Sequence, residues 1–378
     1  MTTAIMAAFL GPGATGRVSF SRLSLYLFLL GYALASLVAP SGSAQSFVRV
    51  SLGLLCLFAA CVEGASSVGV VRAIFAALVL SVAAIVSAAY TGNTELYSFV
   101  WVWSYLGPAL AFYVSGITVR AAKWLAILVS AVYLVFMLLG WDPGDAVAVG
   151  SRNIISVYVL FYGIIYCYVA TREGKLPSLL PATLGLIVCM WAEGRTGFVA
   201  SVVLFVFILL DNLYIRRSDV FRFVVPIIFA VVATAVIAYA FRDQWLSILE
   251  RFTKSGTTDV GRSYLLEEYA TGLGSSAANV FLGVPFSDYY WLTYFDNPHN
   301  SIVFLHSRFG LLGFALVAYY LARAVFSLSR RHGAFFVAVI AVAILRALTD
   351  VTCFTGLFDV LWWIVILDAF GHRWEGKG

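Results

Sequence analysis

The chain has 378 residues, of which 62% are hydrophobic and 11% are charged, and its formal net charge is +5. Ordinary globular domains are about 45–50% apolar and about 25% charged, so this composition excludes a soluble fold. A lipid bilayer accommodates such a chain, because each crossing needs a helix of about 20 apolar residues. The sequence therefore predicts an all-α integral membrane protein whose residues 1–378 form a single transmembrane domain.

Apolar runs of spanning length follow one another along the chain, and each predicts a transmembrane helix. They cover 22–39, 47–63, 68–90, 97–118, 123–140, 153–171, 177–192, 196–214, 220–241, 300–326, 334–349 and 354–370. Between the predicted helices 9 and 10, residues 242–299 form the one long polar stretch, rich in charges and turn residues. We expect about twelve helices, although eleven or thirteen also fit, because several runs are short or adjoin one another.

The positions of Lys and Arg predict the orientation. With a cytoplasmic N-terminus and twelve crossings, about fifteen of the 24 basic residues fall in one set of short loops. The positive-inside rule makes that set cytoplasmic. Both termini are then expected in the cytoplasm and the 242–299 loop outside it. The positive net charge is explained by this topology, so it does not indicate a nucleic-acid partner.

The remaining basic residues lie on the opposite face: Arg49, Arg152, Arg195, Arg242, Arg251, Lys254, Arg262, Arg308 and Arg346. An arginine near the bilayer needs water or a partner, and its planar fork suits a phosphate or diphosphate. Contact with lipid headgroups, or pairing of Arg195 with Glu193 and Arg346 with Asp350, explains any single one equally well. This is the better explanation for Arg49, Arg242 and Lys254. The group as a whole favours an anionic ligand.

A second candidate is the string NPHNS at 297–301, directly before the tenth predicted helix. His299 is the one histidine expected in an outer loop, and an imidazole can accept a proton from a hydroxyl near neutral pH. At a helix N-terminus it would also lie where the backbone favours an anion. The alternative is structural: Asn300 or Ser301 caps the helix, and His299 is a polar interfacial residue.

Several strings in order carry a family resemblance: RN at 152–153, EGRTGF at 193–198, ERF at 250–252, GRSYLLEEY at 261–269, FLGVPF at 281–286 and PHNSIVFLHSRFGLLGF at 298–314. The set resembles the O-antigen polymerase and O-antigen ligase superfamily of bacterial envelope enzymes. The likeness covers about 150–325, and the first five helices match only in topology. Where the family often has SR, this chain has Gly194 before Arg195, and the arginine is kept.

The resemblance implies a GT-C-like membrane glycosyltransferase that uses a glycan on undecaprenyl diphosphate at the periplasmic face of the bacterial inner membrane. Carried over by motif, His299 is the expected catalytic base, and Arg195 and Arg262 are expected to bind the diphosphate and stabilise the leaving group. Substrate binding is expected of four more residues: Arg152, Arg251, Asn300 and Arg308. The expected partners are the lipid-linked donor, a glycan acceptor and the bilayer, with a chain-length regulator as a further candidate.

No cofactor or metal is expected. Metal-dependent relatives need carboxylates near the first outer loop to hold a divalent cation, and residues 40–46 contain no acid. The five cysteines form no CxxC pair, and four lie in apolar runs, so they do not predict a metal site.

The expected function is that of an O-antigen or exopolysaccharide polymerase, which transfers the glycan to the non-reducing end of a lipid-linked repeat unit. Two alternatives remain open. A ligase would pass the same donor glycan to lipid A core sugar, and sequence scarcely separates these acceptors. A transporter or flippase of lipid-linked sugar also suits twelve helices, but such folds usually contain internal repeats, and none is evident here.

Overall fold

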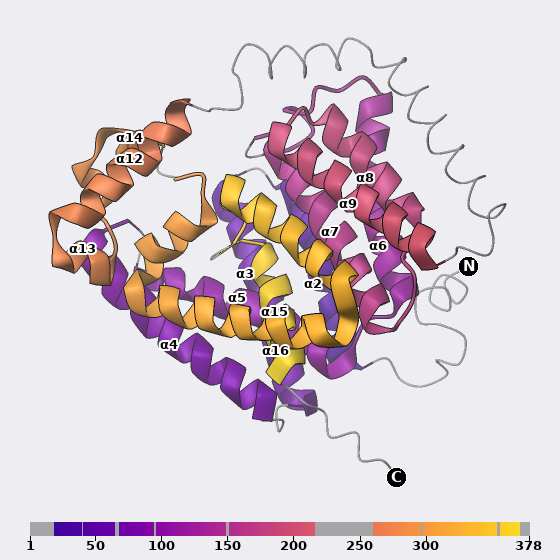
Figure 1. Ribbon diagram of the computed structural model, residues 1–378, viewed down its shortest axis with the longest axis horizontal. Coiled ribbons are helices and arrows are strands. Elements are labelled where there is room, and N and C mark those ends of the chain that lie inside the picture. Colours follow the sequence, from indigo (N-terminus) through magenta and orange to yellow (C-terminus); the bar gives the residue numbers. More distant parts are fainter. Residues whose placement is uncertain are drawn as a thin grey trace.

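The computed structural model describes residues 19–39, 41–64, 68–93, 96–148, 151–215, 260–295, 298–353 and 356–370. Within these ranges the regular structure is entirely helical, as expected, with no β-strand (Figure 1). The predicted helix 220–241, Arg251 and both chain ends lie outside the described residues.

The helices follow the predicted apolar runs to within a few residues. They are α2 Phe20–Val38, α3 Gly42–Gly64, α4 Val68–Thr91, η1 Leu96–Phe99, α5 Val100–Ser115, α6 Val119–Leu138, α7 Asn153–Arg172, α8 Leu179–Trp191, α9 Arg195–Ile215, α12 Val260–Ser275, α13 Ala277–Leu282, η2 Phe286–Asp288, α14 Tyr290–Phe295, α15 Ser301–Thr349 and α16 Phe358–Phe370. Of those described, seven are long and apolar enough to cross a membrane: α2, α3, α4, α6, α7, α9 and α15. The chain is therefore a multi-pass membrane protein by helix length and composition.

Helix α15 contains two of the predicted crossings in one element. A straight helix of its 49 residues would be about 74 Å long. However, Gly310 and Gly333 have non-helical dihedral angles, with φ of 61° and 75°. The two ends of the element meet, because the Ser301 hydroxyl donates a hydrogen bond to the Asp350 carbonyl oxygen at 2.8 Å. The arms 311–332 and 334–349 thus fold back on each other at Gly333, as Figure 1 shows.

The two bends provide a matched test of close packing. Their dihedral angles are nearly equal, but a Cβ on Gly310 would lie 2.2 Å from the Phe281 carbonyl oxygen, whereas a Cβ on Gly333 would meet nothing within 4 Å. Both alanine variants should lose about 1–3 kcal/mol to backbone strain. We expect Gly310→Ala to lose clearly more than Gly333→Ala in thermal unfolding of the detergent-purified protein. Equal melting temperatures for the two variants would contradict this contact.

Helix packing in the bundle relies on small residues. A Cβ on Gly53 of α3 would lie 2.1 Å from the Ser104 carbonyl oxygen of α5, and one on Gly107 of α5 would lie 2.1 Å from the Gly53 carbonyl oxygen. Such contacts let two backbones approach closely, which is a main source of helix association in a membrane. Helix α7 is the most buried of the seven candidate spans in the described residues, with 83% of its spanning stretch buried.

The described part of the predicted 242–299 loop is a small helical unit (α12–α14), seen at the left of Figure 1. It has its own core, made by Leu265, Tyr269, Val284, Phe286 and Leu292. The end of α4 and helix α15 both attach it to the bundle. At α4, the Tyr90 hydroxyl donates a hydrogen bond to Asn279 Oδ1 of α13 at 2.8 Å. Asn93 after α4 donates a hydrogen bond to the Val284 carbonyl oxygen at 2.7 Å and accepts one from the Phe286 N–H at 2.6 Å. Helix α15 provides the second attachment.

That second attachment uses His306. Its Nδ1 lies 2.6 Å from the Tyr269 hydroxyl, and its Nε2 lies 2.8 Å from the Val280 carbonyl oxygen. A carbonyl can only accept, so we assign the proton to Nε2, and Nδ1 accepts from the tyrosine. Both ring nitrogens therefore join α15 to the unit, which gives His306 a structural role.

Candidate active site

His299 lies in the turn between α14 and α15. Its backbone φ is +48°, and its ring lies 6.1 Å from the Phe295 ring, measured between centroids. The next residue, Asn300, caps α15, because its side-chain oxygen accepts hydrogen bonds from the N–H groups of Ile302 and Val303 at 2.9 and 3.2 Å. This is the structural alternative that the sequence allowed for Asn300. Its oxygen is committed to the cap, so only its amide group is left to meet a substrate.

A carboxylate from the other end of α15 faces the imidazole. The distance from Asp350 Oδ1 to His299 Nδ1 is 3.7 Å, which is within ion-pair range but longer than a direct hydrogen bond. Asp350 Oδ2 accepts from Arg346 at 3.0 Å, and Oδ1 accepts from the Val351 N–H at 2.9 Å. Burial favours protonation of Asp350, but His299 and the Arg346 charge outweigh it and hold the pKa of this carboxyl well below its usual value. The carboxylate is therefore charged at neutral pH.

Arg346 connects the imidazole to two other helices. The side chain is 1% exposed, and besides Asp350 it donates to the Thr196 hydroxyl at 3.3 Å and the Asn153 carbonyl oxygen at 3.4 Å. Asn153 begins α7 and Thr196 is the second residue of α9. The Arg346 guanidinium therefore contacts the N-terminal ends of both α7 and α9. Its partner Asp350 follows the last residue of α15 and lies beside the first. The predicted Arg346–Asp350 pair is confirmed, but the sequence did not reveal its central position.

A second ion pair lies between the starts of α7 and α9. Arg152 Nη1 is 2.7 Å from Glu193 Oε2, so the acid that was predicted to pair with Arg195 pairs with Arg152. The reason is geometric, because Arg152 and Glu193 each precede a helix start and the two starts adjoin. Arg195 is the first residue of α9, next to Thr196 and hence to the Arg346 contact.

Two glycines explain why the starts of α7 and α9 can lie so close. A Cβ on Gly197 would lie 2.3 Å from Ser156 Oγ, and one on Gly194 would lie 2.7 Å from Asn153 Oδ1. The glycines of EGRTG thus allow the helix that carries Arg195 to lie against the helix that Arg152 precedes.

Backbone conformation marks the same region. Among the described residues, the non-glycine positions with positive φ are Glu193 at 53° and His299 at 48°. Such conformations cost about 1–3 kcal/mol and cluster at functional sites. Glu193 and His299 each take part in one of the two ion pairs just described.

The other predicted arginines lie farther along the chain. Arg262 is in the first turn of α12 and is half-buried. From Tyr264 in the same turn, a series of ring contacts through Trp291 and Phe295 reaches His299. Arg308 lies two turns into α15, with its guanidinium 4.2 Å from the centroid of the Phe304 ring.

Two apolar cavities are lined in large part by helix α15. The larger, of about 520 Å³, runs between the arms of α15 and is lined by Ile302, Leu305, Phe314, Val317, Ala318, Leu321, Ala322, Val325, Phe326, Ser329, Val337, Ile344, Ala347, Leu348, Cys353 and Trp362. One end of this cavity is formed by Ile302, Ala347 and Leu348, which are close in the chain to His299 and Arg346. Such a cavity suits an extended hydrocarbon chain.

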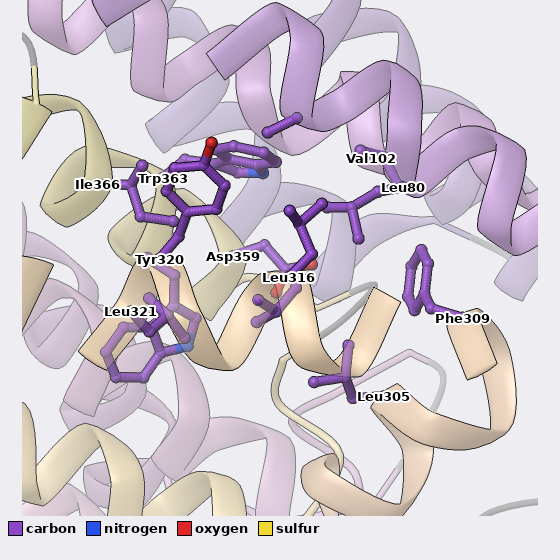
Figure 2. A pocket seen from close by; sticks show the side chains of 13 residues that line it. Leu80, Val102, Leu305, Phe309, Leu316, Tyr320, Leu321, Asp359, Trp363 and Ile366 are labelled. Carbon is purple, nitrogen blue, oxygen red and sulfur yellow. The ribbon is translucent and has the colours of Figure 1, made fainter. Parts of the chain in front are cut away.

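The smaller cavity, of about 50 Å³, lies between α4, α5, α15 and α16 (Figure 2). In Figure 2 the Asp359 carboxylate points into it among apolar side chains such as Leu80 and Leu316. An ionisable residue inside an apolar predicted helix marks a functional candidate. Sequence reasoning could have selected Asp359 on that ground and did not.

Metal-binding geometry is not evident in the part of the chain that the structure describes, where no three His, Cys, Asp or Glu side chains group together. Comparison with known protein families, with curated proteins and with solved structures finds no match to this chain. A functional assignment therefore rests on the motifs and on the contacts of these residues.

Proposed function

We propose that this protein is a glycosyltransferase that elongates a bacterial polysaccharide, an O-antigen or exopolysaccharide, at the periplasmic face of the inner membrane. The donor is a glycan on undecaprenyl diphosphate, and the acceptor is the non-reducing end of a lipid-linked repeat unit. The main support is the contact of the His299 imidazole with Asp350. Arg346 pairs with Asp350 and also contacts the starts of two helices. One of these helices begins with Arg195, and the other follows Arg152.

The chemistry follows from these groups. We assign the Nδ1 proton of His299 to the side facing Asp350, which leaves Nε2 to accept the proton of the acceptor hydroxyl. The acceptor oxygen forms a bond to the anomeric carbon of the donor while the bond from that carbon to the diphosphate oxygen breaks. The electron pair of the broken bond stays on the diphosphate. Arg195 and Arg262, with Arg152 as a third contact, stabilise this charge in a partly dry site.

The cavity between the α15 arms supports a lipid-linked donor. Most of its lining is apolar, and the end formed by Ile302, Ala347 and Leu348 is close to His299 and Arg346. A polyprenyl chain in this cavity would place its diphosphate at that end, near the arginines. The proposal includes no metal requirement, so transfer should persist in EDTA.

The test is complementation of a strain that lacks the gene. We expect His299→Ala, Arg195→Ala and Arg262→Ala to reach the membrane but give no polymer, whereas His332→Ala, at the Gly333 bend, should complement. Full polymer from His299→Ala would refute the proposed base.

The accumulating intermediate separates the alternatives. Single lipid-linked repeat units indicate a polymerase. Long undecaprenyl-linked polymer that is missing from the lipid A core indicates a ligase, with the same chemistry at the donor. Repeat units that stay accessible only from the cytoplasm would indicate a transporter instead and would refute a transferase.

A further inference from the structure

Helices α12 and α14 carry a series of aromatic rings that leads to His299. Tyr264 stacks on Trp291 with centroids 5.5 Å apart and planes 8° from parallel, and Trp291 stacks on Phe295 at 6.1 Å and 21°. Tyr290 and Tyr294 form a second stack at 6.3 Å and 18°. We call these five residues, Tyr264, Tyr290, Trp291, Tyr294 and Phe295, the aromatic platform. The Phe295 ring contacts the His299 ring.

Four of the five platform rings are exposed, whereas Trp291 is half-buried and packs against the core of the unit. Tyr290 and Tyr294 are each 69% exposed, and Tyr264 is 44% exposed. On the other side of the same helices, Leu265 and Leu292 are buried in the core of the unit. The fold of the unit therefore does not require the exposed rings. Exposed apolar groups that adjoin one another mark a binding surface.

The platform is also held in place. The Glu268 carboxylate of α12 accepts hydrogen bonds from the N–H groups of Trp291 and Leu292 at 2.9 and 3.0 Å. It thus caps the start of α14 and joins that helix to α12. A surface whose rings are already fixed loses little conformational entropy when a ligand binds.

We propose that the aromatic platform binds the acceptor saccharide. A sugar ring has an apolar C–H face and an edge of hydroxyl groups, and the flat face of tyrosine or tryptophan, with its polar edge, matches both. The series ends at His299, so a saccharide along it would bring a terminal hydroxyl to the imidazole. This identification of the acceptor site rests on the proposed function, whereas saccharide binding itself does not.

A membrane-interface belt is the competing explanation for exposed Tyr and Trp. Rings in such a belt anchor the protein individually in the headgroup region. The rings here stack on one another and converge on an imidazole, which favours a saccharide. The two explanations also differ in the effect of leucine, which keeps apolar area but has no flat face.

The experiment uses the full-length protein in detergent micelles and the oligosaccharide released by mild acid from the host's own lipid-linked repeat unit. Binding is measured by calorimetry or by saturation-transfer NMR. We expect Tyr290→Ala/Tyr294→Ala to weaken binding about tenfold, which corresponds to about 1.4 kcal/mol, because both flat faces of the exposed stack are lost. The leucine pair should weaken it equally. Tyr97→Ala is the matched control, because Tyr97 is 65% exposed but is not part of the platform.

The outcomes are distinguishable. Unchanged binding by the alanine pair, or binding restored by the leucine pair, would overturn the platform. In transfer assays the alanine pair should raise KM for the acceptor and leave KM for the donor unchanged. If the platform binds saccharide but the unmodified protein transfers no glycan, the proposed function fails and the platform stands. If transfer depends on His299 but the alanine pair binds normally, the platform alone fails.

Discussion

His299→Gln is expected to lower the rate of glycan transfer by about 10²- to 10⁴-fold, the usual contribution of a positioned general base. Glutamine keeps the size and polarity of the side chain but cannot accept the proton of the acceptor hydroxyl. Donor and acceptor KM should change little, because the arginines and the aromatic platform remain. The measurement is single-turnover transfer with purified protein, and a rate within threefold of the original would exclude His299 as the base.

Asp350 provides the internal check on this prediction. It faces His299 without touching the reacting atoms, so we regard it as a positioning residue. Asp350→Asn should lower kcat and leave KM unchanged, because the imidazole loses its orientation but no substrate contact is lost. The double variant with His299→Gln should be no slower than His299→Gln alone, since residues that act as a unit are not additive. Additive losses would show that Asp350 acts elsewhere.

Arg346→Met is expected to destabilise the protein by about 3–5 kcal/mol, the cost of removing one partner of a buried ion pair. Arg346 is 1% exposed, and its loss would leave the largely buried Asp350 carboxylate without its cation and the Thr196 hydroxyl without this donor. Most of the cost is the uncompensated charge, so Arg346→Met/Asp350→Asn should recover a large part of it. The measurement is thermal or chemical unfolding in micelles.

A matched control lies on the same helix. Arg323 is exposed and contacts the Tyr319 hydroxyl at 3.0 Å, so Arg323→Met should change stability by less than about 0.5 kcal/mol. If the double variant were as unstable as Arg346→Met alone, the buried charge would not be the cause.

The same pair predicts a change in pH dependence. In the native protein the pKa of Asp350 is lowered, so its contribution is present above the unfolded value of about 3.9 and is lost only as the pH falls through the lower folded value. Asp350 therefore adds no slope to stability between pH 5 and 8. In Arg346→Met the pKa of Asp350 should rise toward the unfolded value, because the effect of the Arg346 charge is lost while burial, His299 and the Val351 N–H remain. The stability that the protein loses below about pH 4 should therefore be smaller in that variant, and an acid slope equal to that of the native protein would contradict the assignment.

The local features of this chain follow from its sequence. Apolar runs of about 20 residues can only be satisfied as helices in lipid, because a helix pairs its own backbone groups. For this reason most predicted runs match helices within a few residues. Asn300 is likewise a cap because of its position before an apolar run, and the Arg346–Asp350 pair follows from a spacing of four residues on one helix.

The arrangement of the site follows from tertiary structure alone. The contacts of Arg346 with Asn153 and Thr196 join positions 193 and 150 residues apart, and no local pattern encodes them. Glu193 pairs with Arg152, 41 residues away, because packing through Gly194 and Gly197 brings two helix starts together. The sequence by itself determined which segments enter the membrane and which residue types could carry the chemistry. Only the fold decided which of them meet, because charges in a low-dielectric interior take the partners that packing brings within reach.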